Sequence, residues 1–407
     1  MLGARALLSA AAVRSTARYM LTLAEDGALE DWSVDRSRLA ATADFVAHVV
    51  RDRYPGLHPP LHARWRHFVF QGRDLWKEIR GARAWPGAAA AARAAFDLVI
   101  TSVLLDAGAG SDWVYRDPTT GITAARSEGL ALASLRWFER GGFSAQAQDP
   151  LRADAAALER IDARSVEDAF QSSTANPLQG AAGRAVLLNR LGSAVQARPD
   201  LFASADLPRP GGLFDALVAR SSAGELPAAT VLEVLLEGLG SIWPNRPNLE
   251  GVPLGDCWPH PALRGPRSAD RFVPLHKLSQ WLAYSLIEPL EGAGLSVCNV
   301  DALTGLAEYR NGGLFVDLGV LVPRDALALS RAHEVSDPFV VGWRAATVAL
   351  LDEIAPLVAT RLGLPREEFP LARVLEGGTW AAGRLLARQK RADAGPPFRV
   401  LSDGTVF

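Results

Sequence analysis

The spacing of hydrophobic residues along the chain is that of α-helices over most of its length. Between positions 274 and 291, Leu275, Leu278, Leu282 and Leu286 recur at intervals of three and four residues. Residues with this spacing lie on one face of a helix. The pattern therefore predicts an amphipathic helix over 274–291, whose polar side chains fall on a different stripe.

The same periodicity predicts further helices along the chain, and Asp35 is expected to cap the second of them. They span 4–28, 35–53, 88–106, 126–138, 150–170, 181–196, 211–239, 338–362 and 375–391. The segment 88–106 is apolar on most sides, which predicts a central, buried helix. In the last residues, PFRVLSDGTVF, apolar positions alternate around Ser-Asp-Gly, and this predicts a short C-terminal β-hairpin.

These elements predict the fold class and the domain organisation. Helical segments far outnumber strands, and the sequence has neither a clean linker nor an internal repeat. We therefore expect a predominantly α-helical fold in a single catalytic domain over residues 1–407. The helices of 4–53 are the segment that could form a subdomain.

Charge and cysteine content exclude several classes of protein. The formal net charge is −2 and no basic run alternates with aromatic residues, so nucleic acid is not an expected partner. Cys257 and Cys298 are too few for a disulfide framework and lack zinc-site spacing, which indicates a reducing, cytoplasmic compartment. No apolar run reaches the roughly 18 residues of a membrane span. Residues 1–20 resemble a transit peptide in composition, but we expect a first helix there.

No metal centre is expected from the histidines. His58, His62 and His67 lie close together in the sequence, but two prolines interrupt the pair with helical spacing. With Arg64 and Trp65 beside them, they fit a polar lining for an anionic ligand better. No cofactor-binding motif occurs, so no cofactor is expected.

Polar residues of the predicted helix at 274–291 are the first candidates for a site. Lys277, Gln280 and Trp281 fall off its leucine face. Lysine is rare in this arginine-rich chain, which favours a use for the compact, titratable ammonium of Lys277. The alternatives are an exposed lysine and, for Trp281, plain core packing.

A polar turn follows that helix in the sequence. Glu308, Tyr309, Arg310 and Asn311 bring together an acid, a phenol, a guanidinium and an amide. Two glycines come next and permit a tight turn or close approach to a ligand. The alternative is a structural turn, held by ion pairs, that caps the following helix.

Two loops at helix ends supply further candidates, because sites tend to be placed there. Asp112 and Trp113 lie in a glycine- and proline-rich loop, and Arg126 and Glu128 open the next helix.

The long loop 241–263 carries Asp256, Trp258 and His260. Aromatic plates beside an acid suit a flat or sugar-like ligand. Core packing is the alternative for Trp258.

Common catalytic signatures are absent from the sequence. It has no GxSxG, P-loop or HExxH motif, and no GxGxxG after a strand. What remains is a set of carboxylates, arginines, one lysine and tryptophans. Hydrolysis of N-glycosidic bonds uses such groups, because a carboxylate can position water or stabilise an oxocarbenium-like transition state. Any polar cavity of a helical protein could show the same groups.

Several motifs resemble those of the uracil catabolism protein 4 family. They are PLHKLSQWLAYSLIEPLE, LTGLAEYRNGGLFVDLGVL, VLEGGTWAAGR, PPFRVLSDGTVF, RWRHF, LLDAGAGSDWVYRD, RSEGLALASL, NPLQGAAGRA and LGDCWPH, so the resemblance covers nearly the whole chain. It implies an enzyme of a route in which uracil becomes a nucleotide and a cyclohydrolase-like enzyme opens the ring. Ribosylurea-type intermediates of that route lead to urea.

A fainter likeness is to the queuosine salvage proteins. These are helical N-glycosylases that act on a nucleoside 5′-phosphate and are related in shape to DNA glycosylases. Lys277 and Gln280 match their Lys-x-x-Gln helix, and Glu308, Tyr309 and Arg310 match their Asp-Tyr-Arg turn. Here the acid is glutamate, and the proline-containing continuation is missing, which puts a direct transfer of the acid's role in doubt.

Together these observations lead to one hypothesis, hydrolysis of the N–C1′ bond of a ribosylurea, as its 5′-phosphate, to urea and ribose 5-phosphate. Glu308 is expected to be the base or oxocarbenium stabiliser, with Asp256 or Asp112 as second carboxylate. Lys277 and Gln280 would assist the urea leaving group.

In the same hypothesis Arg310 and Arg126 would hold the phosphate. The alternatives are hydrolysis of the ureide amide bond in the same route and a non-catalytic protein that binds the intermediate. The expected partner in each case is a small ribosyl ureide or nucleotide-like molecule. The sequence does not specify an oligomeric state.

Overall fold

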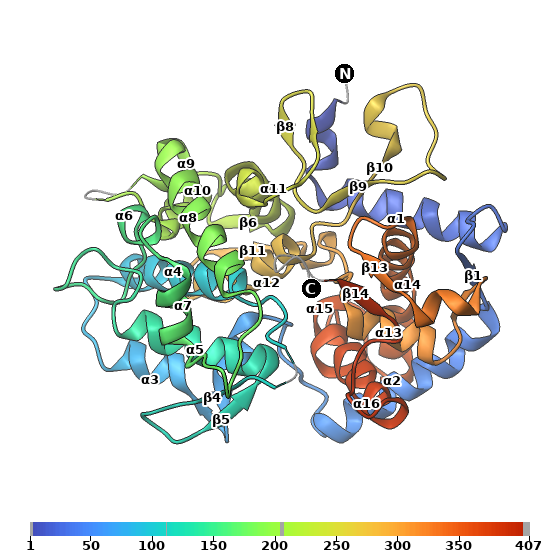
Figure 1. Ribbon diagram of the computed structural model, residues 1–407, viewed down its shortest axis with the longest axis horizontal. Coiled ribbons are helices and arrows are strands. Elements are labelled where there is room, and N and C mark those ends of the chain that lie inside the picture. The colour runs from blue at the N-terminus through green and yellow to red at the C-terminus, as the bar shows by residue number, and fades with distance from the viewer. Residues whose placement is uncertain (1–2, 111, 204–206, 402–407) are drawn as a thin grey trace. The chain divides into compact units, whose positions relative to one another are not determined.

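A computed structural model of the chain describes residues 3–110, 112–203 and 207–401 (Figure 1). It is predominantly α-helical, as predicted, and its described strands form only two-stranded pairs. None of the described helices is long and apolar enough to cross a bilayer.

Contacts divide the described chain into two compact units. Unit 1 holds the described residues of Met1–His62, Arg246–Gln280 and Val300–Leu401, and unit 2 holds those of Ala63–Asn245 and Trp281–Asn299. That the whole chain forms one domain stays a prediction.

Unit 1 is built around α14 (Pro338–Leu362), which has the bounds predicted from the sequence. Pro338 fits the first turn, where the Asp337 side chain accepts a hydrogen bond from the Phe339 N–H. Gly363 ends the helix in the left-handed conformation. The helices of unit 1 that pack on α14 include α1 (Ala10–Glu25), α2 (Leu39–Arg53), α13 (Tyr309–Asp317) and α15 (Leu371–Val374).

The predicted N-terminal helices each begin with a separate short turn. A 3-10 turn, η1 (Ala4–Leu7), precedes α1, and η2 (Arg36–Arg38) precedes α2. The Asp35 side chain accepts from the Ser37 N–H, so the predicted cap belongs to η2.

Short strands of unit 1 form antiparallel and parallel pairs. The antiparallel pairs are β1 (Trp32–Val34) with β12 (Leu321–Pro323), β7 (Asn248–Leu249) with β8 (Val252–Pro253), and β9 (Cys257–Pro259) with β10 (Phe272–Pro274). The parallel pair is β13 (Ala332–Glu334) with β14 (Arg399–Leu401). The first arm of the predicted C-terminal hairpin is thus a strand, β14. The turn and second arm lie outside the described residues.

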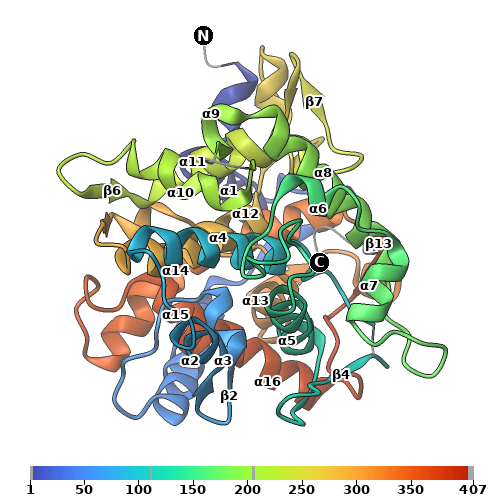
Figure 2. The same ribbon diagram turned by 90° about the vertical axis from the view of Figure 1, so that its left-hand side faces the viewer.

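Unit 2 is organised around α4 (Ala88–Leu104), the predicted buried helix. All its residues from 94 to 104 are buried. Helices α5 (Arg126–Glu139), α8 (Ala181–Ala197) and α10 (Leu213–Val218) pack against it, and both views of the ribbon show α4 among them (Figures 1 and 2). The remaining helices that lie within unit 2 are α3 (Leu75–Gly81), α6 (Ala155–Leu158), α7 (Ala163–Ala169), α9 (Pro199–Phe202) and α11 (Ala228–Leu239).

Two predicted helices of unit 2 are broken in the structure. The segment 150–170 forms α6 and α7, because Asp154 and Asp162 each cap a new helix start. The segment 211–239 is interrupted by β6 (Glu225–Pro227), which pairs in parallel with β11 (Ser296–Cys298). The antiparallel strand pairs of this unit are β2 (Val69–Phe70) with β3 (Arg73–Asp74) and β4 (Val114–Arg116) with β5 (Thr123–Ala125).

Helix α12 (Lys277–Glu291) starts in unit 1 and continues in unit 2. It begins three residues later than predicted because Pro274 lies in β10 and His276 has a positive φ of 48°. The predicted leucine face is buried, but so is every other residue from 278 to 287. The polar residues of this stretch, which were predicted to lie off the leucine face, are therefore buried as well.

The predicted helix at 375–391 begins with a wide turn. Residues Leu375–Thr379 form a π-helical turn, η9, and α16 (Trp380–Lys390) follows. A methyl group on Gly377 would meet Pro59, and one on Gly378 would meet Val46. The two glycines thus let the turn lie close to neighbouring side chains, and π turns of this kind are frequent at functional sites.

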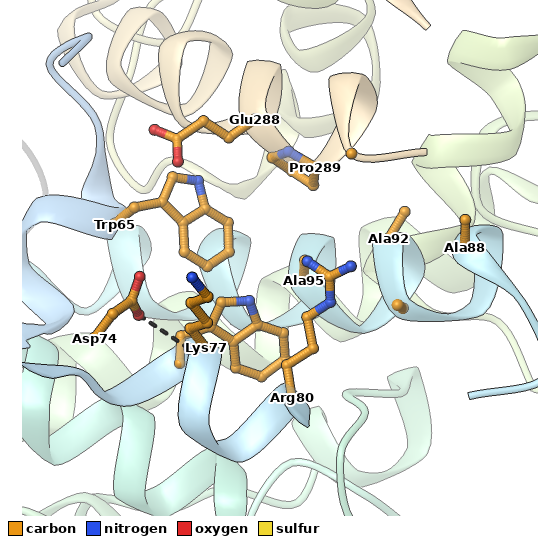
Figure 3. A pocket seen from close by; sticks show the side chains of 12 residues that line it. Trp65, Asp74, Lys77, Arg80, Ala88, Ala92, Ala95, Glu288 and Pro289 are labelled. Carbon is orange, nitrogen blue, oxygen red and sulfur yellow. Dashed lines mark hydrogen bonds between the residues drawn. The ribbon is translucent and has the colours of Figure 1, made fainter. Parts of the chain in front are cut away.

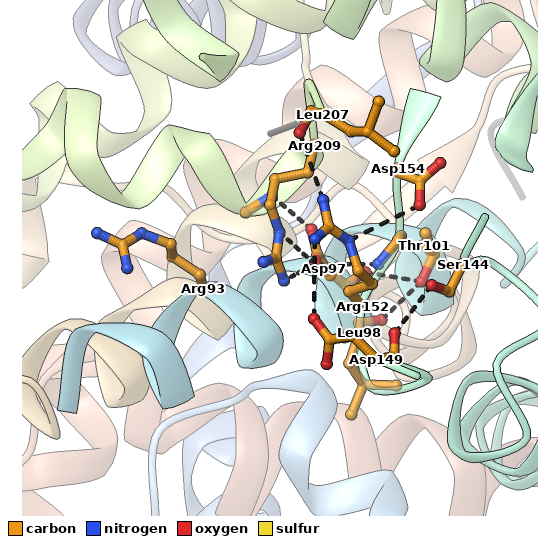
Figure 4. A network of polar contacts seen from close by, with 12 residues as sticks. Arg93, Asp97, Leu98, Thr101, Ser144, Asp149, Arg152, Asp154, Leu207 and Arg209 are labelled. Atoms are coloured by element: carbon orange, nitrogen blue, oxygen red, sulfur yellow. Dashed lines mark hydrogen bonds and ion pairs between the residues drawn. The ribbon is translucent and has the colours of Figure 1, made fainter. Parts of the chain in front are cut away.

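A buried carboxylate in α4 holds the surrounding loops of unit 2 in place (Figure 4). Asp97 accepts hydrogen bonds from the Arg209 guanidinium, from the Gly211 N–H at 2.6 Å and from the Ala153 N–H at 3.0 Å. Arg152 lies nearby, 3.7 Å from the Asp154 carboxylate. One helix residue therefore fixes two loops that are far apart in the sequence.

We expect Asp97→Asn to lower the free energy of unfolding by about 3–5 kcal/mol, because it removes the charge of a fully buried carboxylate that pairs with Arg209. Urea denaturation followed by circular dichroism measures the change. Asp200→Asn, which changes an exposed carboxylate paired with Arg198, should leave the midpoint almost unchanged. Equal effects of the two substitutions would contradict the role given to Asp97.

Candidate functional site

Polar and aromatic side chains of unit 1 gather around the indole ring of Trp380, the first residue of α16. We call this set the Trp380 cluster, and its members are His62, Tyr309, Arg310, Glu376, Trp380 and Arg384. The guanidinium carbon of Arg310 lies 4.6 Å from the Trp380 ring centroid, and that of Arg384 lies 5.4 Å from it. The His62 ring centroid is 6.1 Å from the same indole. Sequence positions more than 300 residues apart therefore meet at one ring.

Arg310 lies over two aromatic rings, since its guanidinium carbon is also 5.0 Å from the Tyr309 ring. Such contacts stabilise a guanidinium through the negative face of the ring. A guanidinium carries five donors in one plane, a geometry that matches carboxylate and phosphate groups. Two predicted residues of the polar turn, Tyr309 and Arg310, thus lie beside Trp380, which was not predicted as a site residue.

The polar turn before α13 is an N-cap. One carboxylate oxygen of Glu308 accepts from the Arg310 N–H at 2.9 Å, and the other accepts from the Asn311 N–H at 2.6 Å. This is the capping alternative considered for the turn, and it sets the direction in which α13 starts. The Glu308 side chain is buried at this point, directly before Arg310 in the chain.

Two glycines allow the helices at the turn to approach closely. A methyl group on Gly383 of α16 would overlap the Arg310 carbonyl oxygen, and one on Gly312 would lie 2.5 Å from the Trp343 ring. The crossing of α13 and α16 therefore depends on the missing side chain at Gly383.

His62 and Glu376 form a buried pair, with the His62 Nδ1 2.7 Å from a Glu376 carboxylate oxygen. The backbone N–H of His62 donates to the Ala372 carbonyl, which fixes the ring beside the π turn. A carboxylate on one imidazole nitrogen orients the other nitrogen for proton transfer.

Two buried oxygens next to this cluster have no hydrogen-bond partner among the described residues. They are Asn311 Oδ1 and Thr379 Oγ. The Asn311 amide nitrogen, in contrast, donates to the Leu306 carbonyl at 3.2 Å. Buried polar atoms are normally satisfied, so such oxygens are positions where a ligand donor can bind.

Asp256, predicted as a second carboxylate, is engaged in a buried ion pair. Its oxygens lie 2.8 and 2.7 Å from the two terminal nitrogens of Arg344, and it also accepts from the Trp258 indole N–H and the Lys277 backbone N–H. Burial alone would raise the pKa of this carboxyl. The charge and hydrogen bonds of Arg344 and the other donors outweigh burial and hold the pKa well below its usual range.

Two other predicted residues of unit 1, Gln280 and His260, make hydrogen bonds to neighbouring segments, and a third, Trp258, contacts an arginine. The Gln280 amide nitrogen donates to Thr304 Oγ at 2.8 Å, and its oxygen accepts from the Thr304 N–H. His260 accepts from the Ala262 N–H and contacts the Pro338 carbonyl, and burial lowers its pKa. Trp258 lies under the Arg246 guanidinium.

In unit 2, Glu128 and Trp281 lie near a second polar group centred on Arg64. This fully buried guanidinium contacts Asp106 at 2.8 Å, and its carbon is 5.5 Å from the Trp281 ring. His67 lies edge-on to the same indole, and the charge of Glu128 acts on Arg64.

Three further predicted residues of unit 2 are Asp112, Trp113 and Arg126. Trp113 is a core residue whose indole N–H donates to the Phe170 carbonyl. Asp112 is exposed, and Arg126, with a φ of 54°, begins α5.

Sequence reasoning named His62 among the histidines of a polar lining for an anionic ligand, but it did not single out Glu376, Trp380 or Arg384 as site residues. The LEGGTW motif was a signal for two of these, Glu376 and Trp380. Of the three histidines, His58 is exposed, His62 pairs with Glu376, and His67 belongs to unit 2. Each has its own surroundings, and none of the described residues form a group of three or more metal-ligating side chains.

The protein is predominantly helical, and in unit 1 two arginines and a histidine–glutamate pair lie around the Trp380 ring. A family model described as "Protein of unknown function (DUF1688)" matches residues 6–407, and the chain belongs to this family. It is 37% identical over 409 residues to protein urg3 of Schizosaccharomyces pombe and 35% identical over 439 residues to uracil catabolism protein 4 of Lachancea kluyveri. Both alignments cover 98% of each chain.

These comparisons confirm the resemblance to the uracil catabolism protein 4 family that the motifs indicated. The fainter likeness to queuosine salvage proteins stays a prediction.

The Asp256–Arg344 pair predicts a pH-dependent stability. Because the folded pKa of Asp256 lies below its unfolded value of about 3.9, the pair stabilises the fold above about pH 4 and loses this effect as the pH falls towards the folded pKa. Asp256→Asn should cost about 3–5 kcal/mol at pH 7. The difference in Tm from the unchanged protein should narrow between pH 5 and pH 3. Asp168→Asn, at an exposed position, should show no such gap; a constant gap for Asp256→Asn would contradict the assignment.

Gly383→Ala should displace the Arg310 backbone and destabilise the protein by about 1–3 kcal/mol, the usual cost of overpacking. Thermal unfolding followed by circular dichroism measures it. The matched control is Gly183→Ala in α8, where a methyl group meets nothing within 4 Å. That substitution should be neutral or stabilising, since alanine favours helices. A neutral Gly383→Ala would show that the crossing can relax.

Proposed function

We propose that the protein acts in uracil catabolism and hydrolyses the N–C1′ bond of a ribosylurea-type intermediate, as its 5′-phosphate, to urea and ribose 5-phosphate. The pathway rests on membership of the family and on the relative named uracil catabolism protein 4. The reaction rests on one observation: a buried His–Glu pair and two guanidiniums surround the same indole ring.

The proposed reaction transfers the elements of water across the C1′–N bond. The water oxygen bonds to C1′, and the electron pair of the breaking bond leaves with the urea nitrogen. In the proposal the His62–Glu376 pair removes a proton from water, and a proton is returned to the urea nitrogen. The Glu308 carboxylate stabilises the positive charge that develops on the sugar.

Arg310 and Arg384 are proposed to hold the phosphate. Two guanidiniums near one indole ring offer several planar donors, which matches phosphate better than a single ammonium would. The unpartnered Asn311 Oδ1 and Thr379 Oγ would accept hydrogen bonds from the urea N–H groups or sugar hydroxyls. In this proposal Glu376 takes the role of second carboxylate that was expected of Asp256 or Asp112.

The test is proton NMR of the purified protein with ribosylurea 5′-phosphate, ribosylurea, UMP and uridine in parallel. We expect loss of the ureide-linked anomeric signal together with the appearance of ribose 5-phosphate and urea. Line broadening without turnover would favour a binding protein instead. Breakdown that keeps the anomeric linkage would favour hydrolysis of the ureide amide bond.

Variants assign the roles within the cluster. Glu376→Gln should reduce turnover by about 10²–10⁴-fold, the usual contribution of general acid–base catalysis. Glu308→Gln should also abolish turnover, while the fold survives because the loss of an N-cap costs only about 1 kcal/mol. Glu367→Gln, an exposed glutamate, is the control and should be fully active. Near-normal turnover in Glu376→Gln or in Glu308→Gln would remove that residue from the mechanism.

A further inference from the structure

A cavity in unit 2 has the features of a separate small-molecule site (Figure 3). Its volume is about 210 Å³, which is room for a single-ring ligand and not for a whole nucleotide. It is formed by α3, by alanines of α4 and by the last turns of α12. None of these lining residues belongs to the Trp380 cluster, so the cavity is independent of the proposed reaction.

Flat apolar surfaces form the walls of this cavity. The rings of Trp65 and Trp76 lie 6.1 Å apart at an interplanar angle of 32°. The Trp65 indole N–H donates to the Ser285 carbonyl at 2.7 Å, which fixes the orientation of the ring. Alanine methyl groups of α4 and the ring of Pro289 line other sides. Aromatic and apolar walls with a few polar groups are the usual composition of ligand sites.

Two cations point toward the same space. Lys77 and Arg80 extend from α3, and Figure 3 shows their charged ends directed toward the region between Trp65 and Pro289. Neither has an ion-pair partner among the described residues. The lining carboxylates are already engaged: Asp74 accepts from the Lys77 backbone N–H and caps α3, and Glu288 pairs with Arg66.

We propose that this cavity binds a planar, single-ring molecule that carries one anionic group, a carboxylate or a phosphate monoester. The ring would pack on the tryptophans and alanines, while Lys77 and Arg80 would hold the anion. The carboxylate of Glu288 lies at the same cavity and could accept a hydrogen bond from a ring N–H. Both parts of the ligand are needed, because the walls select a flat ring and α3 selects a negative charge.

The experiment is ligand-observed saturation-transfer NMR with the full chain and four probes. Benzoate and phenyl phosphate carry both a ring and a charge, benzamide lacks the charge, and cyclohexanecarboxylate lacks the planar ring. We expect binding of benzoate or phenyl phosphate that exceeds binding of both controls, and the tighter of the two identifies the anion. Equal signals for all four probes, or none, would overturn the proposal.

Three variants locate the binding. The double variant Lys77→Gln/Arg80→Gln should weaken binding of the charged probe by about tenfold or more, the effect of losing charge-assisted hydrogen bonds. Arg116→Gln removes a charge from an exposed position of β4 and should leave binding unchanged. Ala92→Leu fills the cavity without altering its charges and should abolish binding while circular dichroism stays the same. Unchanged binding in the double variant or in Ala92→Leu would place the probe elsewhere.

Discussion

The buried ion pair between Asp256 and Arg344 fixes the frame on which unit 1 builds its polar site. The carboxylate receives both terminal nitrogens of the guanidinium and the N–H of Lys277, while the Asp256 carbonyl accepts from the backbone N–H of Leu275 and His276. The third guanidinium nitrogen donates to the Ala307 carbonyl. One ion pair thus joins a loop, the start of α12, the second turn of α14 and the residue before the Glu308 turn. Removing either partner would strand a buried charge, which is far costlier than losing a surface ion pair.

The Glu308 turn connects the Asp256–Arg344 ion pair to the Trp380 cluster. Ala307 is held by Arg344, and the next side chain caps α13, so the direction of that helix is set by backbone hydrogen bonds. Arg310 then meets α16 where Gly383 leaves room for its carbonyl. The guanidinium is consequently placed over Trp380 by rigid elements and not by a mobile loop. Such preorganisation is what a site for a charged ligand requires.

The spacing of apolar residues predicted the long buried helices. It did not predict the places where contacts with distant segments interrupt or widen a helix. Helices α4 and α14 follow from their apolar residues alone. The break at β6 depends on its pairing with β11, about seventy residues further along the chain, and the π turn depends on glycines packed against Pro59 and Val46. Neither contact can be read from a local window of sequence.

The same limit explains which site residues could be predicted. Glu308, Tyr309 and Arg310 form a local concentration of polar groups, and such a concentration is visible in the sequence. Asp256 beside a tryptophan looked equally promising, but its partner Arg344 lies 88 positions away, and only that partner reveals the structural use of the acid. Trp380 was not predicted as a site residue because a tryptophan at the start of a helix is most often part of the core.

The side chains of the Trp380 cluster and those of the unit 2 cavity are suited to different tasks. The Trp380 cluster contains an imidazole held by a carboxylate, an arrangement that can move a proton. Among the described residues that line the unit 2 cavity there is no histidine, and its two carboxylates are occupied by a helix N-terminus and by Arg66. A group that already neutralises a neighbour is poorly placed to act as a base. The cavity is therefore suited to recognition through shape and charge, whereas proton transfer belongs to the cluster in unit 1.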